Sequence, residues 1–449
     1  MSVPSPHSRL TPISRTSVPT WTRSAGLTAG GIVAIVLATG GLLLGRIDLA
    51  LLALPHIVAL AWTRQRRPAT GAVSEATLTL REPRDSEIEF TLAFDVPTGV
   101  EAVVVRSTVL GGDTNEIVLA APVVRDVTGS IPLLHSGLQE LVRFEYRFLG
   151  TDAGATSPPA ESLVATRVIS PARARVASLP LPLRLRGLTG SHESARAGDG
   201  GDFRDIHPFA VGDRLRRIDW KTTARRGQNP GDLYVRRTSA LSDATVLIVL
   251  DSRDDVGEQV AQWTSNIAAT KGVSALDVAR EAASSLATAY IQAGDRVGFQ
   301  DLSSRNRMVA HAGGHRHLRQ LLRAIEVTQP SSIPYRRARP PIVPPGALVY
   351  VLSSLLDDEA VRLALRWRVT GHRVVVVDVL PAARFARTTR AERLAHRIVM
   401  MQRDDRIRAF RQRGVEYLRW PEEDNVTSRR ARLQILSRPT RGAMAGGRR

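Results

Sequence analysis

Two neighbouring stretches organise this chain: GGDFRDIHPFAVGDRLRRIDWKTTARRGQNPGDLYVRR at residues 200–237 and ATVLIVL at residues 244–250. The first carries too much charge to form a core, yet it holds too many Trp, Phe, Ile and Tyr residues to be a plain linker. The second has no charged residue, which is typical of a strand buried on both faces of a parallel sheet. The order predicts a polar, aromatic segment that leads into an α/β domain.

Strand and helix patterns alternate after this point. Ser274 and Asp277 form a capping-box pattern that opens a helix, and Gly294 ends it. Such repeated βα units predict a doubly wound parallel sheet. Strands are expected at residues 296–302, 347–353, 372–380 and 415–420, and helices at residues 317–327, 358–370 and 388–413.

The central stretch resembles a known family. VGDRLRRIDWK at residues 211–221, Ala224-Arg225 and LYVR at residues 233–236 resemble the signature of the bacterial domain of unknown function 58. The resemblance covers roughly residues 177–380, and it implies a fold similar to the von Willebrand factor A domain. Proteins similar to this family typically occur alongside MoxR-type AAA+ ATPases, so the resemblance also implies such an ATPase as a partner.

The charged residues of the central stretch allow two interpretations. In the first they form a salt-bridged lid packed on the sheet edge, with Ile218 and Trp220 as core anchors. In the second they form a surface that binds a partner protein, because Trp and Arg dominate such interfaces. The surface would contain Asp213, Arg214, Arg217, Asp219, Trp220, Lys221, Arg225 and Tyr234.

A carboxylate cluster follows the strand at residues 244–250. Ligands of open parallel sheets bind beyond the carboxyl ends of the strands, where Asp251 lies. The family resemblance places the Asp-x-Ser-x-Ser metal motif here, but Arg253 and Asp255 replace its two serines. Asp251, Asp254, Asp255 and Asp357 would form a degenerate Mg²⁺ or Mn²⁺ site, with Asp358 as a substitute for Asp357. Alternatively, Asp251 and Asp254 cap the loop and pair with nearby arginines.

Other patterns carry weaker chemistry. His311, His315 and His317 are close in sequence, but no acidic ligand accompanies them. The run Gly198 to Gly201 lacks the spacing of a phosphate-binding loop, and no Ser lies in a G-x-S-x-G pattern. With no cysteine in the chain, thiolate metal sites and a Cys nucleophile are excluded. We therefore expect no catalytic residues, and no cofactor apart from Mg²⁺ or Mn²⁺ at the degenerate carboxylate site.

The net charge is +19, and it is carried almost wholly by Arg, with Lys only at Lys221 and Lys271. This favours contact with acidic partners or anionic lipid. The arginines are dispersed and no nucleic-acid-reading motif accompanies them, so nucleic acid is not the expected partner.

Two apolar segments precede the soluble part, from Gly26 to Leu44 and from Ile47 to Trp62. They predict two transmembrane helices joined by a tight turn, although the second is short and contains Pro55. Three arginines before the pair, three just after it and one in the turn place both ends in the cytoplasm. A cleaved signal peptide and a single span that exports the remainder are the alternatives.

The remaining parts complete the predicted domain order. Residues 72–170 alternate apolar and polar residues between turn signals, which predicts a small β-sandwich that serves as a spacer or interaction module. The predicted domains are a disordered basic tail (1–25), two transmembrane helices (26–67), the sandwich (72–170), the signature segment with the α/β domain (171–425) and a disordered basic tail (426–449). Together they predict a membrane-anchored, non-enzymatic adaptor in the cell membrane. The alternative is a divalent-metal-dependent enzyme or ligand-binding protein that uses Asp251.

Overall fold

The computed structural model describes residues 12–65, 73–81, 87–96, 98–121, 123, 126–150, 154–183, 185, 190–229, 231–263, 272–303, 308–330, 341–421 and 426–437. The chain divides into two compact units, Met1–Leu134 with Gln139–Arg167 and His135–Leu138 with Val168–Arg449. Parts of the predicted basic tails, residues 1–11 and 438–449, lie outside the described residues, as do Arg66 and Arg67.

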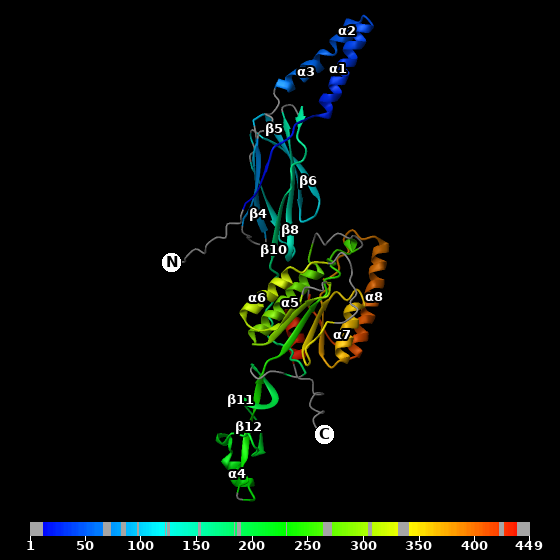
Figure 1. The fold of residues 1–449 in the computed structure, drawn as a ribbon. Coiled ribbons are helices and arrows are strands. Elements are labelled where there is room, and N and C mark those ends of the chain that lie inside the picture. The colour runs from blue at the N-terminus through cyan, green and yellow to red at the C-terminus, as the bar shows by residue number, and fades with distance from the viewer. Residues whose placement is uncertain are drawn as a thin grey trace. The chain divides into compact units, whose positions relative to one another are not determined.

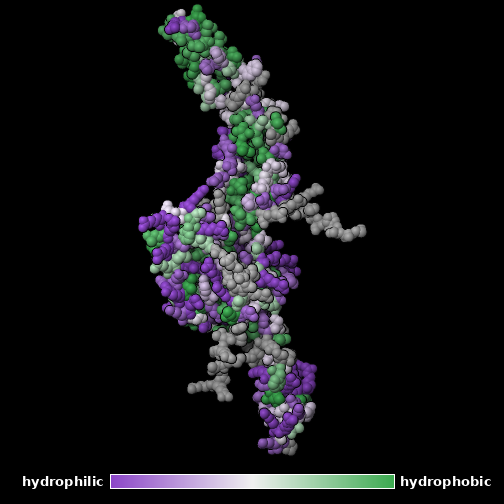
Figure 2. All heavy atoms as spheres, turned by 180° about the vertical axis from the view of Figure 1, so that it is seen from behind, coloured by the Kyte–Doolittle hydropathy of each residue, from purple (hydrophilic) through white to green (hydrophobic). Residues whose placement is uncertain are grey.

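The first unit contains an apolar helical hairpin. Helix α1 spans Ala25–Leu43, and the second apolar segment is split into α2 (Ile47–Leu51) and α3 (Leu54–Gln65). Pro55 lies in the first turn of α3, where its missing N–H removes no helical hydrogen bond. Two segments, Ala25–Leu43 and Ile47–Gln65, are long and apolar enough to cross a membrane. Figure 2 shows hydrophobic residues over much of the surface of these helices.

Glycine allows the helices of this hairpin to approach closely. A Cβ atom added at Gly41 of α1 would lie 2.6 Å from the backbone nitrogen of Ala50 in α2, so no larger residue fits there. Gly30 faces the ring of His56, and Gly31 faces Leu60, both on α3. Small residues at helix contacts are the usual means of close packing between apolar helices.

The rest of the first unit consists of two antiparallel sheets, with strand orders β1-β3-β4-β7 and β2-β9-β8-β5-β6, and β10 also pairs with β8. Their facing sides are joined by aromatic contacts, because Phe90 lies 5.3 Å from Phe144 and Phe94 lies 5.4 Å from Tyr146 between ring centroids. Their strands are β1 (Ile13–Ser17), β2 (Thr22–Arg23), β3 (Ser74–Leu80), β4 (Glu87–Asp95), β5 (Val100–Val109), β6 (Thr114–Ala120), β7 (Asp126–Pro132), β8 (Gly137–Gly150), β9 (Ala155–Thr156) and β10 (Leu163–Ile169).

Strand β1 corrects the prediction that residues 1–25 form a disordered tail. It pairs antiparallel with β3 along its whole length. The Ser17 and Ser74 hydroxyls lie 3.0 Å apart across this pair, as do those of Ser14 and Thr77. The Ser and Thr side chains of this segment therefore supply cross-strand hydrogen bonds.

The second unit is built on a six-stranded sheet of order β15-β14-β13-β16-β17-β18. Strands β14, β13, β16, β17 and β18 run parallel, while β15 pairs antiparallel with β14 at the edge. The sheet is therefore mixed, and β15 is a strand that the sequence pattern did not reveal. Its strands are β13 (Thr245–Leu250), β14 (Arg296–Asp301), β15 (Met308–Ala312), β16 (Leu348–Ser353), β17 (Arg373–Asp378) and β18 (Glu416–Arg419).

Helices cover both faces of this sheet, as Figure 1 shows. One apolar cluster joins it to α5, α6 and α9, and a second joins the other face to α7 and α8. The capping box predicted at Ser274 and Asp277 is confirmed at the start of α5. The helices are η3 (Val260–Gln262), α5 (Ala275–Gln292), α6 (His315–Glu326), α7 (Glu359–Val369), α8 (Arg390–Gln412) and α9 (Val426–Ser437).

Helix α9 corrects the second predicted tail. Leu433 is buried in the cluster on the α5 face, and Leu436 packs against the same cluster. The backbone carbonyl of Leu436 also accepts a hydrogen bond of 2.5 Å from Arg373. The predicted tail therefore begins with a helix, because two leucines three residues apart lie on one face and reach the core.

The central stretch forms a separate part of the second unit. Strand β11 (His192–Pro208) and β12 (Tyr234–Ser242) make an antiparallel ribbon, and η2 (Leu215–Arg217) and α4 (Trp220–Arg226) lie between them. The pairing register shifts between Gly198 and Phe203, since both lie opposite Thr238. Residues 203–237 are called the arm below, and Figure 1 labels β11, β12 and α4 within it.

Candidate functional site

Polar contacts fix the backbone of the arm. The Asp219 carboxylate accepts a hydrogen bond of 2.9 Å from Thr222 N and so caps α4, while Asp219 N donates to Tyr234 O over 2.8 Å. Tyr234 N in turn donates to the Thr223 hydroxyl over 3.0 Å. Helix α4 is thereby held against β12 through hydrogen bonds rather than through an apolar core.

The arm exposes its large apolar side chains. Trp220 is 68% exposed, Leu215 is 67% exposed, and Val211 is fully exposed. Within the described residues of the arm, Val235 is the only buried side chain. With one buried side chain among its described residues, the arm has little apolar burial to stabilise it. An exposed Trp beside other exposed apolar residues is typical of a binding surface.

The acidic residues of the arm are engaged internally. It contains eight arginines and one lysine against four aspartates. Asp213 accepts a hydrogen bond from Ala210 N over 2.9 Å and pairs with Arg237 at 3.3 Å, and these contacts lower the pKa of its carboxyl. Asp232 accepts hydrogen bonds from two backbone N–H groups of the α4–β12 loop, and Asp205 lies 3.7 Å from Arg204. The surface that remains for a partner is therefore mainly cationic, in keeping with the hydrophilic residues that Figure 2 shows over much of this part.

The structure brings the predicted interaction residues together but corrects their roles. Trp220 is not a core anchor, since most of its side chain is exposed, and Ile218 is half-buried in an isolated bridge to Val235. Arg214, Lys221 and Arg225 are exposed. Arg217 and Tyr234 are half-buried, as are Asp213 and Asp219, the two aspartates that hold the backbone. The burial of these residues does not fit a lid anchored by Trp220.

A second group of charged residues lies at the carboxyl ends of the parallel strands. Strand β14 lies next to β13 on one side, and β16 lies next to β13 on the other side. The strand order therefore reverses between β13 and β16, and ligands of open parallel sheets bind at the carboxyl ends of the strands at such a switch point. Asp251 follows β13, and Asp357 lies in the loop after β16. The guanidinium group of Arg253 binds both carboxylates.

The contacts of Arg253 are bidentate on each side. Its Nε and Nη2 donate to the two oxygens of Asp251, each over 2.8 Å. Its Nη1 and Nη2 donate to Asp357 over 2.5 and 2.9 Å. Ser353 Oγ donates to Asp251 over 2.8 Å as well. The side chains of Arg253 and Asp251 are only 3% and 4% exposed, whereas that of Asp357 is 42% exposed.

Burial and charge act in opposite directions on this group. Burial alone lowers the pKa of Arg253, but the bonds to Asp251 and Asp357 outweigh it, and the pKa is raised overall. The guanidinium therefore stays charged, as an arginine paired with carboxylates does. The pKa of Asp254 is raised by its own burial and by the negative charges of Asp251 and Asp357.

The other predicted metal ligands point elsewhere. Asp255 accepts a hydrogen bond of 3.0 Å from Leu276 N at the start of α5, and burial raises the pKa of its carboxyl. Asp358 pairs with Arg406 at 2.5 Å. Within the described part of the chain, no group of three or more His, Asp or Glu side chains is arranged to hold a metal ion. The donor set does not fit Mg²⁺ or Mn²⁺, because a fixed cation already binds the oxygens that would ligate the metal.

Further contacts at this edge were not foreseen from the sequence. At the end of β17, Asp378 forms an ion pair with Arg403 of α8 and accepts a hydrogen bond of 2.6 Å from the Tyr417 hydroxyl. At the end of β14, Asp301 accepts a hydrogen bond of 2.6 Å from the Ser252 hydroxyl. Arg403 shares a helical face with Ile407 and Phe410. An arginine within an apolar stripe of a helix is the sequence signal that could have indicated a buried ion pair.

The three candidate histidines do not form a metal site among the described residues. His317 bonds the Val297 carbonyl over 2.7 Å through its Nε2. The ring of His311 packs against Gly298, and burial lowers its pKa. His315 is exposed at the start of α6. His311 and His317 thus have structural contacts.

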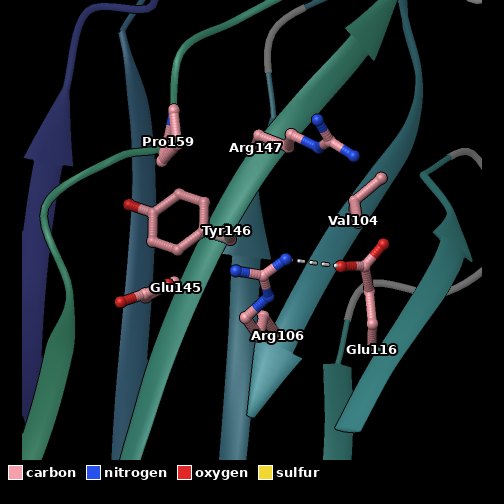
Figure 3. A pocket seen from close by; sticks show the side chains of 7 residues that line it. All are labelled: Val104, Arg106, Glu116, Glu145, Tyr146, Arg147 and Pro159. Atoms are coloured by element: carbon pink, nitrogen blue, oxygen red, sulfur yellow. Dashed lines mark hydrogen bonds and ion pairs between the residues drawn. The ribbon is translucent and has the colours of Figure 1, made fainter. Parts of the chain in front are cut away.

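A small concavity lies on the six-stranded sheet of the first unit. It is lined by side chains from β5, β6 and β8 and by Pro159, and within it Arg106 pairs with Glu116 at 3.2 Å (Figure 3). Its volume of about 80 Å³ corresponds to roughly two or three water molecules. We assign it no function.

Comparison with known proteins bears on the second unit. Residues 205–428 match the family model described as "Protein of unknown function DUF58". This DUF58 segment begins within β11 and holds the arm from Asp205 onwards, the whole six-stranded sheet and the charged residues at its carboxyl edge. The similarity to the family that the central stretch suggested is thereby confirmed over residues 205–428. The match begins later than the expected residue 177, and it extends beyond residue 380 to include α8 and β18.

The other comparisons add little. No curated protein matches the chain. The solved structure titled "Crystal structure of Br derivative BhCBM56" is 17% identical, covering 20% of this chain and 91% of its own, with a TM-score of 0.15. A score of this size supports no conclusion about the fold or function of this chain.

Proposed function

We propose that the chain is a membrane-anchored, non-enzymatic adaptor whose DUF58 segment presents the arm to a partner protein. The partner we propose is a MoxR-type AAA+ ATPase, as the family resemblance implies. The sheet, which we take to be a doubly wound fold similar to a von Willebrand factor A domain, is the scaffold of this adaptor. The single observation that carries the proposal is the exposure of Trp220 and Leu215 on an arm that is otherwise basic.

The energetics of the arm support a binding role. Burying a large apolar side chain stabilises a protein by about 1.5–3 kcal/mol. The arm lacks most of this stabilisation at Trp220 and Leu215, because both side chains are exposed. A partner that covers these residues recovers that free energy in the complex. Hydrogen bonds at the N-terminal cap and in the middle of α4 hold the surface in place before binding, which reduces the entropy lost on binding.

The carboxyl edge of the sheet supports the non-enzymatic part of the proposal. The switch point, where a cofactor or metal commonly binds, is filled by the Asp251–Arg253–Asp357 ion pairs. We propose that this guanidinium takes the structural place of a divalent cation, so that the adaptor works without metal. The alternative of a metal-dependent enzyme gains no support from a site closed in this way.

The apolar helices supply the proposed anchor. We propose that α1 and the α2–α3 segment cross the cell membrane as a hairpin, with both ends in the cytoplasm. Arg23 before the pair and Arg64 after it agree with that orientation, since basic residues gather on the cytoplasmic side.

Co-purification of the ATPase tests the proposal. The full chain, extracted in a neutral detergent, is expected to retain the MoxR-type ATPase of the same organism. Trp220→Ala should lose at least nine-tenths of the retained ATPase, a drop on the scale of about 1.4 kcal/mol or more. Met401→Ala is the matched control, because Met401 is 61% exposed on α8, and it should retain the ATPase fully. Equal retention by both variants would contradict the proposal.

A further inference from the structure

Helix α4 carries one face whose charges favour a particular kind of partner. Lys221 and Arg225 are four residues apart, so their side chains lie side by side on the helix. Two like charges at this spacing repel each other by about 0.2–0.5 kcal/mol in an isolated helix. Trp220 and Ala224 form the adjacent row, which places an exposed aromatic ring beside the cationic pair.

Among the described residues, neither Lys221 nor Arg225 forms an ion pair with an acidic side chain of the arm. Asp219 is the nearest acidic residue, and its carboxylate is used to cap the helix. Asp213, Asp232 and Asp205 each have the contacts described above. Lys221 and Arg225 can therefore both pair with carboxylates of a partner protein.

We infer that the α4 face, formed by Trp220, Lys221 and Arg225, binds a carboxylate-rich segment of the partner protein. This inference rests on the proposed function and adds the chemistry of the partner. Two or more Asp or Glu side chains of the segment pair with Lys221 and Arg225, and an apolar residue of the segment packs on the Trp220 ring. The guanidinium of Arg225 can hold a carboxylate through two parallel hydrogen bonds.

The same face is poorly suited to a lipid surface. A helix that lies in a membrane interface needs a continuous apolar face along its length. Helix α4 has only seven residues, and beside Trp220 its only apolar residue is Ala224. The polar residues Thr222 and Thr223 interrupt any wider apolar surface. Charge complementarity at close range, rather than insertion, is what this face offers.

A pair of peptides provides the test. The full chain in phosphatidylcholine nanodiscs is titrated with a fluorescent peptide of six Glu and two Leu residues, and with the same peptide in which every Glu is Gln. The Glu peptide should bind saturably and at least tenfold more tightly than the Gln peptide. Lys221→Glu combined with Arg225→Glu should weaken its binding at least tenfold, and so should Trp220→Ala.

Arg393→Glu combined with Arg397→Glu is the matched control, because these two arginines have the same spacing and are exposed on α8. This control should bind the Glu peptide within twofold of the unchanged chain. Equal binding of the Glu and Gln peptides, or an equal loss in the control, would overturn the inference. Capture of vesicles containing phosphatidylserine through the α4 face, without peptide binding, would overturn it in favour of a lipid surface.

The co-purification experiment separates the two levels of the argument. If the ATPase is retained through Trp220 but the Glu peptide does not bind, the adaptor function stands and the acidic-segment inference fails. If neither the ATPase nor the peptide binds, both are overturned.

Discussion

Removal of the Arg253 guanidinium should destabilise the sheet strongly. In Arg253→Ala, the carboxylate of Asp251 stays buried without its counter-charge, since only 4% of that side chain is exposed. Breaking a buried ion pair by removing one partner costs about 3–5 kcal/mol. We expect about 3 kcal/mol, the lower end of that range, because Asp357 is 42% exposed and water can solvate it.

Hydrogen exchange of the β13 amides is the suitable assay, because it reports on this sheet alone in a chain of two compact units. A loss of about 3 kcal/mol corresponds to roughly 140-fold faster exchange. Adding Asp251→Asn to Arg253→Ala should restore at least half of the protection, since the unpaired charge is then gone. If the β13 amides of Arg253→Ala exchange less than threefold faster than those of the native chain, the reasoning is refuted.

Divalent cations provide the complementary measurement. A ligand present at 100 times its dissociation constant stabilises the folded state by about 2.7 kcal/mol. We expect Mg²⁺ and Mn²⁺ to leave the exchange of β13 unchanged in the native chain. Slower exchange that Asp251→Ala abolishes would show a metal site and would contradict the role given to Arg253.

Two further predictions concern pH and topology. His192 lies 3.0 Å from the buried Asp295, and this bond raises the pKa of His192. The bond therefore stabilises the folded state fully below the unfolded pKa of about 6.5. That stabilisation is lost as the pH rises through the raised pKa of the folded state. His192→Gln should accordingly lower the free energy of unfolding more at about pH 5.5 than at about pH 9. Hydrogen exchange of the Ala244 amide, which donates to Asp295, measures this free energy. Equal losses of unfolding free energy at both pH values would contradict the prediction. The chain has no cysteine, so single-cysteine variants label at one place. A membrane-impermeant maleimide on intact cells should label Arg46→Cys in the α1–α2 turn but not Arg397→Cys on α8, and the reverse result would mean that the second unit is exported.

The sequence predicted the regular elements of the second unit well where a single periodic signal was strong. The α5 capping box and the long α8 helix are present, since Ser274 with Asp277 and Thr389 with Glu392 form local signals that need no tertiary information. Strand β15 was missed because Met308–Ala312 is too short to show a clear alternation. Its position is decided by pairing with β14, and a local sequence pattern does not show this tertiary contact.

The candidate site was harder to predict, because its residues gain their roles through contacts that the sequence does not show. Trp220 looks like a core residue by its type, and only the absence of an apolar surface around α4 makes it exposed. The sequence shows Arg253 in place of a serine of the metal motif, but its second partner, Asp357, is distant in the chain and is brought close by the pairing of β13 with β16. The ion pair of Arg403 was missed for the same reason, since its partner Asp378 lies on another element.

The measurement that tests the central claim most directly is photo-crosslinking from position 220. The full chain is expressed in its native cells with a benzophenone amino acid in place of Trp220, and a matched chain carries it in place of Met401. Adaptor function through the arm predicts a covalent adduct with the MoxR-type ATPase from position 220 and none from position 401. An adduct with lipid alone, or the same adducts from both positions, would contradict the claim.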